Sequence, residues 1–268
     1  MAVVALTDKE FSQFQRFIYE AAGISMANGK QALVSGRLAK RLAHYQLNSY
    51  GEYLRLLESR EQASELQVAV DLLTTNETYF FREPKHFALL RELALEARTA
   101  RRSIRVWSAA SSTGEEAYSI AMVLADVLGE AAWEVLGTDI STRVLERARF
   151  GHYVMERASG VPLDLLKRYC LKGQGKQEGT MLIERSLRQR VQFMHLNLNQ
   201  PLPRLGSFDV IFLRNVMIYF NLETKRQVVA RLLGQLRPGG YLLIGHSETL
   251  NDINDTLQAV APSIYRKP

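Results

Sequence analysis

The 268-residue chain contains very little cysteine. Cys170 is its only one, which excludes an intrachain disulfide and argues against a cysteine-based metal site. We expect Cys170 to be a small, partly buried apolar residue. The five histidines show no metal-ligand spacing either, so the sequence predicts no metal ion.

Long hydrophobic runs are missing as well. No apolar run approaches the roughly 20 residues of a membrane span, and the apolar residues 3–6 are too few for the core of a signal peptide. We therefore expect a cytoplasmic protein without stable membrane insertion. Its formal net charge of +6 indicates an acidic partner, which could be nucleic acid, a membrane surface or an acidic protein.

The most informative segment begins with an apolar run at residues 104–107, which predicts a β-strand. Small residues and Gly114 follow, and then Glu115 and Glu116 at the start of a helical pattern. A second predicted strand ends on Asp139, 25 positions after Gly114. This order is typical of a nucleoside-cofactor site at the carboxyl edge of a parallel sheet, where the acid binds the two ribose hydroxyls.

The same loop lacks the motifs for phosphate-containing cofactors. It has neither the three glycines of G-x-G-x-x-G nor a Gly-Lys-Ser/Thr sequence. Two carboxylates, Glu115 and Glu116, would repel a pyrophosphate but suit a ligand with cationic groups and hydroxyls. S-adenosylmethionine (SAM), with a sulfonium, an ammonium and a ribose but no phosphate, is such a ligand. The simpler alternative, that both acids only cap a helix, is disfavoured by the spacing to Asp139.

The chain divides into two predicted parts. Residues 1–74 show only helical patterns, whereas strand-like and helical runs alternate in residues 75–268, which indicates an α/β fold with a parallel sheet. The helical runs of the first part include 33–45, 50–57 and 61–73, and the strand-like runs of the second are 104–107, 133–137, 191–195, 208–213 and 241–245, with further signals between 257 and 266. At about 163–190, a glycine-rich loop between two β-prone pieces predicts a small inserted β-subdomain.

Four motifs together resemble one known family. They are Asn-Glu-Thr-Tyr-Phe-Phe-Arg at 76–82, Thr-Gly-Glu-Glu-Ala-Tyr-Ser at 113–119, Arg-Asn-Val-Met-Ile-Tyr-Phe at 214–220 and Gly-His-Ser-Glu at 245–248. Over nearly its whole length the chain is similar to the bacterial chemoreceptor glutamate O-methyltransferases, the CheR family. The resemblance implies a class I SAM-dependent methyltransferase sheet of Rossmann-like type, an N-terminal helical domain that recognises receptors, and an inserted β-subdomain. Ala117 departs from the proline of many members, which concerns helix geometry rather than chemistry.

The resemblance also implies an activity. Members transfer a methyl group from SAM to glutamate side chains of methyl-accepting chemoreceptors, which forms glutamyl methyl esters for sensory adaptation and leaves S-adenosylhomocysteine. The implied partner is the acidic helical bundle of the receptor cytoplasmic domain, to which the enzyme is recruited at membrane-bound receptor arrays. We expect a monomeric enzyme that binds no nucleic acid. In part of the family the inserted subdomain also binds a C-terminal receptor pentapeptide, and whether this chain does so stays open. The family's cofactor contacts fall on Asn76, Thr78, Arg82, Glu116, Asp139, Asn197, Leu198, Arg214 and Asn215.

Such a reaction requires no general base, because a glutamate with a pKa of about 4.3 is already an ionised nucleophile. Orientation and exclusion of water remain as the tasks of the enzyme. Arg82 and Tyr219 are our candidate catalytic residues, one as a carboxylate clamp and the other as a hydrogen-bond donor. The alternative partner of Arg82 is the methionine carboxylate of the cofactor. For Tyr219 the alternative is packing in the core, and the spacing does not favour either interpretation. At Asn197 an Asx turn competes with an adenine contact, and for His246 we favour a structural role.

Cationic side chains gather on one face of the predicted helix 33–45. Arg37, Lys40 and Arg41 lie there, with His44 nearby. Such faces are usually only solvated. We favour the alternative that these three residues bind the substrate, because receptor helices are expected to be rich in glutamate.

Two other functions are compatible with the predicted sheet. One is a methyltransferase acting on RNA or a small molecule, and the other is an interaction protein gated by SAM or its product. The chain lacks the Asn/Asp-Pro-Pro-Tyr/Phe signature of enzymes that methylate amino groups of bases, and it shows no aromatic-basic RNA-binding module. The complete set of polar site residues argues against a protein that only senses the cofactor.

Overall fold

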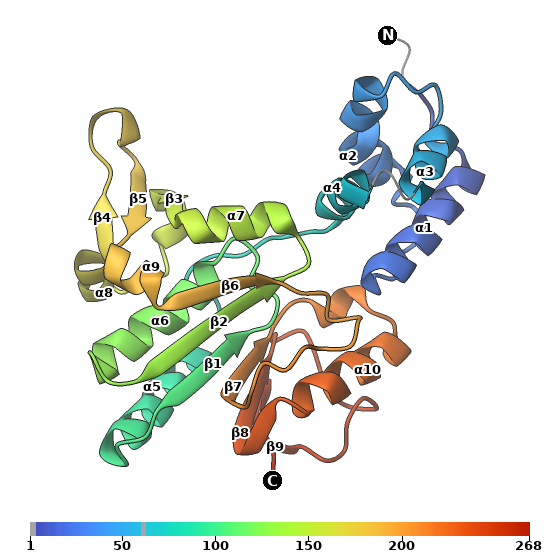
Figure 1. Ribbon diagram of the computed structural model, residues 1–268. Helices are drawn as coiled ribbons and strands as arrows, with labels where there is room; N and C mark the ends of the chain where they lie inside the picture. The colour runs from blue at the N-terminus through green and yellow to red at the C-terminus, as the bar shows by residue number, and fades with distance from the viewer. Residues whose placement is uncertain (1–3, 60–62) are drawn as a thin grey trace.

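The computed structural model describes residues 4–59 and 63–268, with a helical bundle next to an α/β sheet (Figure 1). The bundle consists of α1(Asp8–Ala22), α2(Gln31–His44), α3(Tyr50–Glu58) and α4(Ala63–Leu73). Residues 61 and 62, with which we expected the fourth helix to begin, lie outside the described residues.

Local signals explain how the bundle forms. The Thr7 hydroxyl accepts a hydrogen bond from the Glu10 amide, and the Glu10 carboxylate accepts one from the Thr7 amide, so a capping box begins α1. Gly23 ends this helix in the left-handed conformation, with φ 72°. Phe14 and Leu38 are fully buried in the core that the four helices share.

The central sheet has seven strands in the order β6-β2-β1-β7-β8-β10-β9. In chain order they are β1(Ile104–Ser108), β2(Trp133–Asp139), β6(Val191–His195), β7(Phe208–Leu213), β8(Leu236–Ile244), β9(Gln258–Ala261) and β10(Ile264–Arg266). The first five in the sheet order are parallel neighbours, whereas β10 is antiparallel to both β8 and β9. The predicted α/β class with a parallel sheet is therefore confirmed.

Helices cover both faces of the central strands of this sheet. The helices α5(Pro84–Thr99) and α6(Glu115–Leu128) cover one face, and α10(Leu222–Leu233) covers the other. Because side chains alternate along a strand, Val106 packs toward the first face and Trp107 toward the second, and both are fully buried. None of the described helices is long and apolar enough to cross a membrane.

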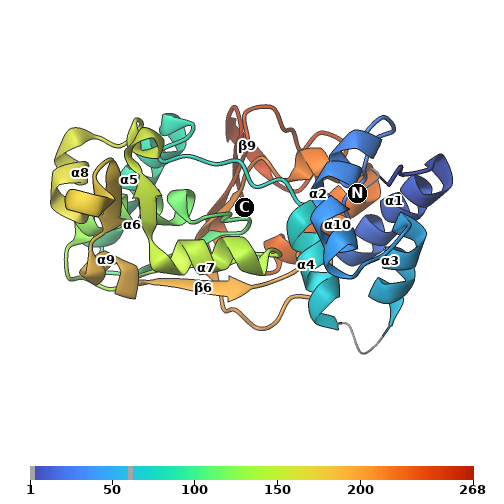
Figure 2. The same ribbon diagram turned by 90° about the horizontal axis from the view of Figure 1, so that it is seen from above.

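A second, smaller sheet is formed by the segment that follows α7(Thr142–Phe150) and precedes β6 in the chain. It contains the antiparallel strands β3(His152–Val154), β5(Thr180–Ile183) and β4(Cys170–Lys172), accompanied by η2(Met155–Ala158), α8(Leu163–Tyr169), η3(Gly175–Gln177) and α9(Arg185–Gln189). This inserted segment and the bundle lie at opposite ends of the molecule (Figure 2). The range of about 163–190 expected from the sequence leaves out β3, because a three-residue strand carries too little pattern to be detected.

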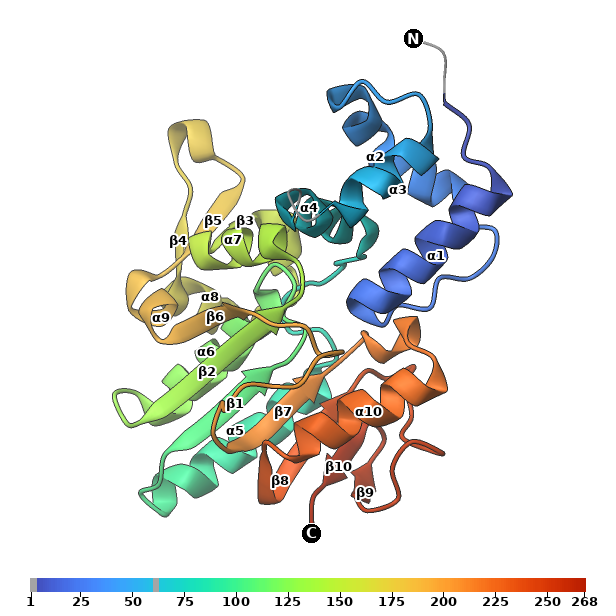
Figure 3. The ribbon, with the colours of Figure 1, turned by 45° about the vertical axis from the view of Figure 1, so that its right-hand side comes forward.

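Direct contacts hold the bundle against the sheet (Figure 3). The Asp71 carboxylate on α4 accepts hydrogen bonds from the Thr142 amide and hydroxyl at the start of α7, at 3.0 and 2.8 Å. The amide of Ser25, after α1, donates to the carbonyl of Tyr219 in η4(Met217–Tyr219) at 2.8 Å. The bundle therefore closes over the carboxyl ends of the parallel strands, where open α/β sheets bind their ligands.

Candidate active site

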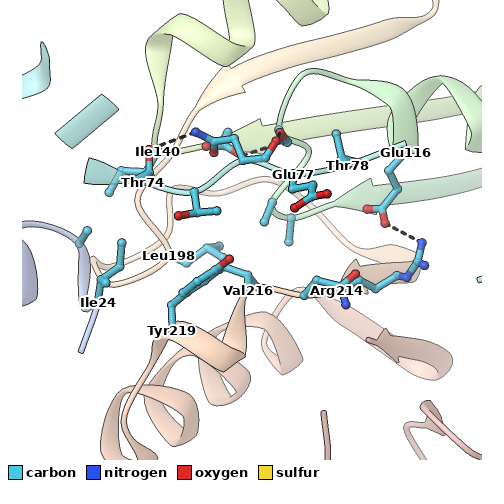
Figure 4. A pocket seen from close by; sticks show the side chains of 18 of the residues that line it. Ile24, Thr74, Glu77, Thr78, Glu116, Ile140, Leu198, Arg214, Val216 and Tyr219 are labelled. Carbon is cyan, nitrogen blue, oxygen red and sulfur yellow. Dashed lines mark hydrogen bonds and ion pairs between the residues drawn. The ribbon is translucent and has the colours of Figure 1, made fainter. Parts of the chain in front are cut away.

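A pocket, partly open to solvent, lies where the bundle meets the ends of β1, β2 and β7 (Figure 4). All nine residues that the resemblance assigns to the cofactor line it, and so does Tyr219. They are Asn76, Thr78, Arg82, Glu116, Asp139, Asn197, Leu198, Arg214 and Asn215. The three residues expected to bind substrate, Arg37, Lys40 and Arg41, are not part of its lining.

The loop after β1 is shaped by one glycine. β1 lies between β2 and β7, where the strand order changes direction and opens a crevice. Gly114 has φ 95°, and a Cβ at this position would lie 2.9 Å from the Cβ of Ala148 and 3.0 Å from the Tyr153 hydroxyl. Only glycine combines this backbone conformation with such a close approach of α6 to α7.

Asp139 ends β2 at the pocket and is 7% exposed. Its two carboxylate oxygens accept hydrogen bonds from the amides of Ser112 and Ser141, each at 2.9 Å. Burial raises the pKa of Asp139, while these amides act in the opposite direction. A carboxylate has about four lone-pair sites, so the oriented acid still has acceptors for two hydroxyl donors.

Arg214 forms the polar end of the pocket. Its guanidinium donates to Glu116 at 2.8 Å and lies 3.1 Å from the carboxylate of Glu83, and its side chain is 2% exposed. Burial raises the pKa of Glu116, and the charge of Arg214 counteracts this. The ion pair between Glu116 and Arg214 presents both signs of charge to the pocket (Figure 4).

Of the two acids that we expected at the ligand, only Glu116 lines the pocket. Glu115 is fully buried and accepts hydrogen bonds from the Thr113 hydroxyl and from Arg157 of the inserted segment, both at 2.6 Å. The expectation is therefore wrong for Glu115. Successive helical residues point about 100° apart, so neighbouring acids at a helix start face different surroundings.

Arg82 lies between Phe81 and Glu83, which both have left-handed backbones with φ 55° and 60°. Such conformations are costly for residues other than glycine and are typical of functional segments. The guanidinium of Arg82 lies 5.6 Å from the centre of the Tyr79 ring and makes one long hydrogen bond, 3.4 Å, to the carbonyl of Glu77. Arg82 therefore keeps donors for a carboxylate in the pocket.

Tyr219 lies at the boundary between the core and the pocket. Its ring is partly buried and packs against the core beneath α10, while its hydroxyl is directed into the pocket (Figure 4). The ring thus fixes the position in which the hydroxyl is presented.

Asn197 uses both ends of its amide within the protein. Its oxygen accepts from the Asn199 amide at 2.9 Å, which is the Asx turn expected as a competitor of a ligand contact. Its nitrogen donates to the carbonyl of Ala21 at 2.7 Å and so connects the pocket to the end of α1. The neighbouring Leu198 is 8% exposed and adds apolar surface to the lining.

The cationic residues of α2 differ in their surroundings. Arg37 donates to two carbonyl groups at the end of α4, at 2.8 and 3.1 Å. Arg41 pairs with Glu65, which is 2% exposed, and a hydrogen bond of 2.8 Å joins them. Lys40 is exposed. Among the described residues, Lys40 makes no side-chain hydrogen bond or ion pair, in contrast to Arg37 and Arg41.

Sequence reasoning assigned no role to Glu248. Its carboxylate accepts hydrogen bonds from the backbone amides of Gly245, Asn215 and Ile218, at 2.7, 2.9 and 3.2 Å. Asn215 has φ 56°, a left-handed conformation that asparagine adopts more readily than most residues, and its amide is bound by this carboxylate. Glu248 therefore holds the loop that presents Asn215 and Tyr219. The motif at residues 245–248 pointed to this residue, because it contributed to the family resemblance although no role was assigned to its glutamate.

Comparison with known proteins decides the family. The model "CheR methyltransferase, all-alpha domain" matches residues 9–74, and "CheR methyltransferase, SAM binding domain" matches residues 76–265. The chain belongs to the CheR methyltransferase family. It is a SAM-dependent methyltransferase, as the resemblance predicted.

Curated relatives are similar over nearly the full chain. The "Chemotaxis protein methyltransferase" of Escherichia coli (strain K12) is 42% identical, over 98% of this chain and 92% of its own. That of Salmonella typhimurium is also 42% identical, over 98% and 91%. "Chemotaxis protein methyltransferase 2" of Pseudomonas aeruginosa is 40% identical, over 97% and 93%. The similarity thus includes the bundle as well as the sheet.

Glu248→Gln is expected to weaken S-adenosylhomocysteine binding and to slow methyl transfer. The amide loses the negative charge, and its NH₂ group cannot accept from a backbone amide, so hydrogen bonds worth about 1.5–3 kcal/mol each are lost. Calorimetry and thermal unfolding measure the two effects. Glu223→Gln, at an exposed position on α10, is the matched control. Wild-type affinity together with wild-type stability in the Glu248 variant would exclude this role.

Proposed function

We propose that this chain transfers the methyl group of SAM to glutamate side chains of chemoreceptors, forming glutamyl methyl esters for sensory adaptation. The observation that carries the proposal is one pocket that joins Asp139, Arg82 and Tyr219 beneath the helical bundle. The similarity to chemotaxis methyltransferases across both parts of the chain supports the substrate class.

The residues of the pocket fit the cofactor. Asp139, buried and held by two amides, would accept hydrogen bonds from the ribose hydroxyls, and Asn197 and Leu198 would contact the adenine. The ion pair of Glu116 with Arg214 suits the zwitterionic amino-acid end. The same end would be held by Asn76, Thr78, Arg82 and Asn215, which also line the pocket. When bound, SAM supplies an electrophilic methyl group on its sulfonium.

The side chains of the pocket need only orient the substrate. A glutamate with an ordinary pKa of about 4.3 arrives ionised at neutral pH, so no residue has to remove a proton. The Tyr219 hydroxyl would donate one hydrogen bond to the attacking carboxylate, and Arg82 would hold that carboxylate or the one of the cofactor. Correct placement of the reacting groups can lower a barrier by about 7–11 kcal/mol.

The parts of the chain have distinct tasks in this proposal. Residues 1–74 recognise the acidic helices of the receptor cytoplasmic domain, and residues 75–268 carry the chemistry. The inserted segment, predicted at about 163–190 and preceded by β3, offers strand edges to a C-terminal receptor peptide. A monomer would reach membrane-bound receptor arrays by binding the receptors themselves.

The direct test is a radiolabelled-methyl assay with membranes that contain or lack chemoreceptors. We expect label in the receptor band, released by mild alkali because a carboxyl methyl ester is labile. Alkali-stable label, or label in RNA or small molecules, would contradict the proposed substrate. Cofactor binding without transfer to any fraction would instead indicate a protein that only senses SAM.

Lys40→Glu is expected to raise the apparent KM for receptor fragments and to leave the affinity for S-adenosylhomocysteine unchanged. Lys40 is exposed on α2 and does not line the pocket. The effect should shrink with added salt, because charges are screened beyond about 10 Å at 0.1 M. Arg204→Glu, exposed just before β7, is the charge-matched control.

Reversing Arg37 or Arg41 tests the same idea less cleanly, because both also hold the bundle together. Reversing the charge of Arg41 would leave the buried carboxylate of Glu65 without this cationic partner and would lower stability. An unchanged KM for Lys40→Glu at low salt would show that this face is only solvated.

A further inference from the structure

Three potential metal ligands meet next to Arg214. The Oε2 atom of Glu83 lies 3.5 Å from Nδ1 of His86 and 3.8 Å from Nε2 of His246. The ligand atoms of the three residues all lie within 4.8 Å of one another. Tetrahedral zinc with ligands at about 2.0–2.2 Å separates them by about 3.3–3.6 Å. Small side-chain adjustments would therefore bring all three atoms to a single ion.

The hydrogen bonds of His86 leave its Nδ1 ready to bind a cation. Its Nε2 lies 2.9 Å from the hydroxyl of Ser263, and that hydroxyl donates its only proton to the carbonyl of Pro262 at 2.6 Å. The proton between His86 and Ser263 is therefore assigned to Nε2, and Nδ1 keeps its lone pair. This is the arrangement of metal-binding histidines, whose second nitrogen donates to a fixed acceptor.

Within the described part of the chain, Nδ1 of His86 has no hydrogen-bond partner, although the side chain is fully buried. Buried polar atoms without a partner are rare in folded proteins and need an explanation. Burial lowers the pKa of His86 to about 4, and the charge of Arg214 acts in the same direction. The lone pair of Nδ1 points into a cluster that contains a carboxylate and a second imidazole.

We propose that Glu83, His86 and His246 bind one divalent cation of the zinc class, with water as the fourth ligand. The His246 side chain is 51% exposed, so an ion can enter from solvent on that side. Neutral imidazoles and a carboxylate are a donor set that zinc prefers.

An ion bound at this site would disturb the ion pair between Glu83 and Arg214. Arg214 lies 3.1 Å from the same Oε2 atom that the ion would bind, so ion and guanidinium compete for one carboxylate. Arg214 also holds Glu116 at the pocket. Zinc is therefore expected to weaken cofactor binding, because it disturbs this chain of ion pairs.

Zinc titration against a chromophoric chelator tests the site itself. We expect one zinc ion per wild-type chain and at least about tenfold weaker binding in His246→Ala. The control is His44→Ala, at an exposed histidine that ends α2, which should retain wild-type zinc affinity. The half-exposed His246 is the position to change, because substitution of the buried His86 risks unfolding. Equal zinc affinity in His246→Ala and the wild type would overturn the proposal.

Calorimetry with S-adenosylhomocysteine tests the competition. Zinc at a concentration that just saturates the wild type should weaken product binding by the wild type and have a clearly smaller effect on His246→Ala. If zinc binds to the wild type but leaves its affinity for the product unchanged, the competition for Glu83 is refuted. Neither measurement depends on the identity of the methyl acceptor.

Discussion

Asp139→Ala is expected to lower the affinity for S-adenosylhomocysteine by about 10²- to 10⁴-fold. The two ribose hydroxyls would lose a charged acceptor, worth about 1.5–3 kcal/mol for each hydrogen bond. Calorimetry measures the effect, and NAD should not compete for the wild-type site, because no phosphate-binding loop is present.

Asp139→Asn is the isosteric control for this prediction. It keeps one acceptor oxygen, so its loss of affinity should be smaller than that of Asp139→Ala. Thermal unfolding must accompany both variants, since Asp139 also accepts from the amides of Ser112 and Ser141. A folded Asp139→Ala variant with normal affinity would refute the assignment.

The affinity for the product should also depend on pH. Burial raises the pKa of Asp139, so this carboxyl group takes up a proton at a higher pH than an exposed aspartate. The protonated form is a poorer acceptor, and affinity is therefore expected to fall as the pH drops toward the raised pKa. Asp139→Asn should lack this component of the pH dependence.

Tyr219→Phe is expected to slow single-turnover methyl transfer by about 10- to 100-fold with little change in product affinity. The phenyl ring preserves the packing against the core beneath α10, whereas the hydrogen bond to a charged carboxylate, about 1.5–3 kcal/mol, is lost. Tyr79→Phe, at a 47% exposed tyrosine of the pocket lining, is the matched control. A wild-type rate in Tyr219→Phe would leave this residue with a packing role only.

The transfer rate itself should be nearly flat between about pH 6.5 and 8.5, because the substrate is ionised throughout this range. A bell-shaped profile centred there would indicate a protein base. If it persisted in histidine-to-alanine variants, positional catalysis without a base would be contradicted.

Local sequence patterns were sufficient for much of the sheet. β6(Val191–His195) and β7(Phe208–Leu213) were predicted with the observed bounds, because short apolar runs between turn signals mark buried strands. Gly114 and the acid 25 positions later predicted the cofactor loop, because both belong to one local strand-loop-helix-strand unit. The family resemblance named further residues of the pocket lining.

The sequence could not predict which of two neighbouring residues with the same chemistry has which role. Glu115 and Glu116 differ only in the direction they face, which the packing of α6 against the inserted segment decides. Arg41 and Lys40 were assigned one role, but only Arg41 meets Glu65, because α4 lies against one side of α2. Side-chain partners of this kind depend on how helices are docked, and docking leaves no local pattern.

The sequence by itself thus determined the class of fold, the cofactor loop and the family. Tertiary structure decided which charges are paired and which distant residues meet. His86 and His246 are 160 positions apart and showed no metal-ligand spacing, yet both reach Glu83. They do so because α5 begins beside the end of β8, and the order of strands in a sheet is set by packing of the whole chain rather than by any local segment.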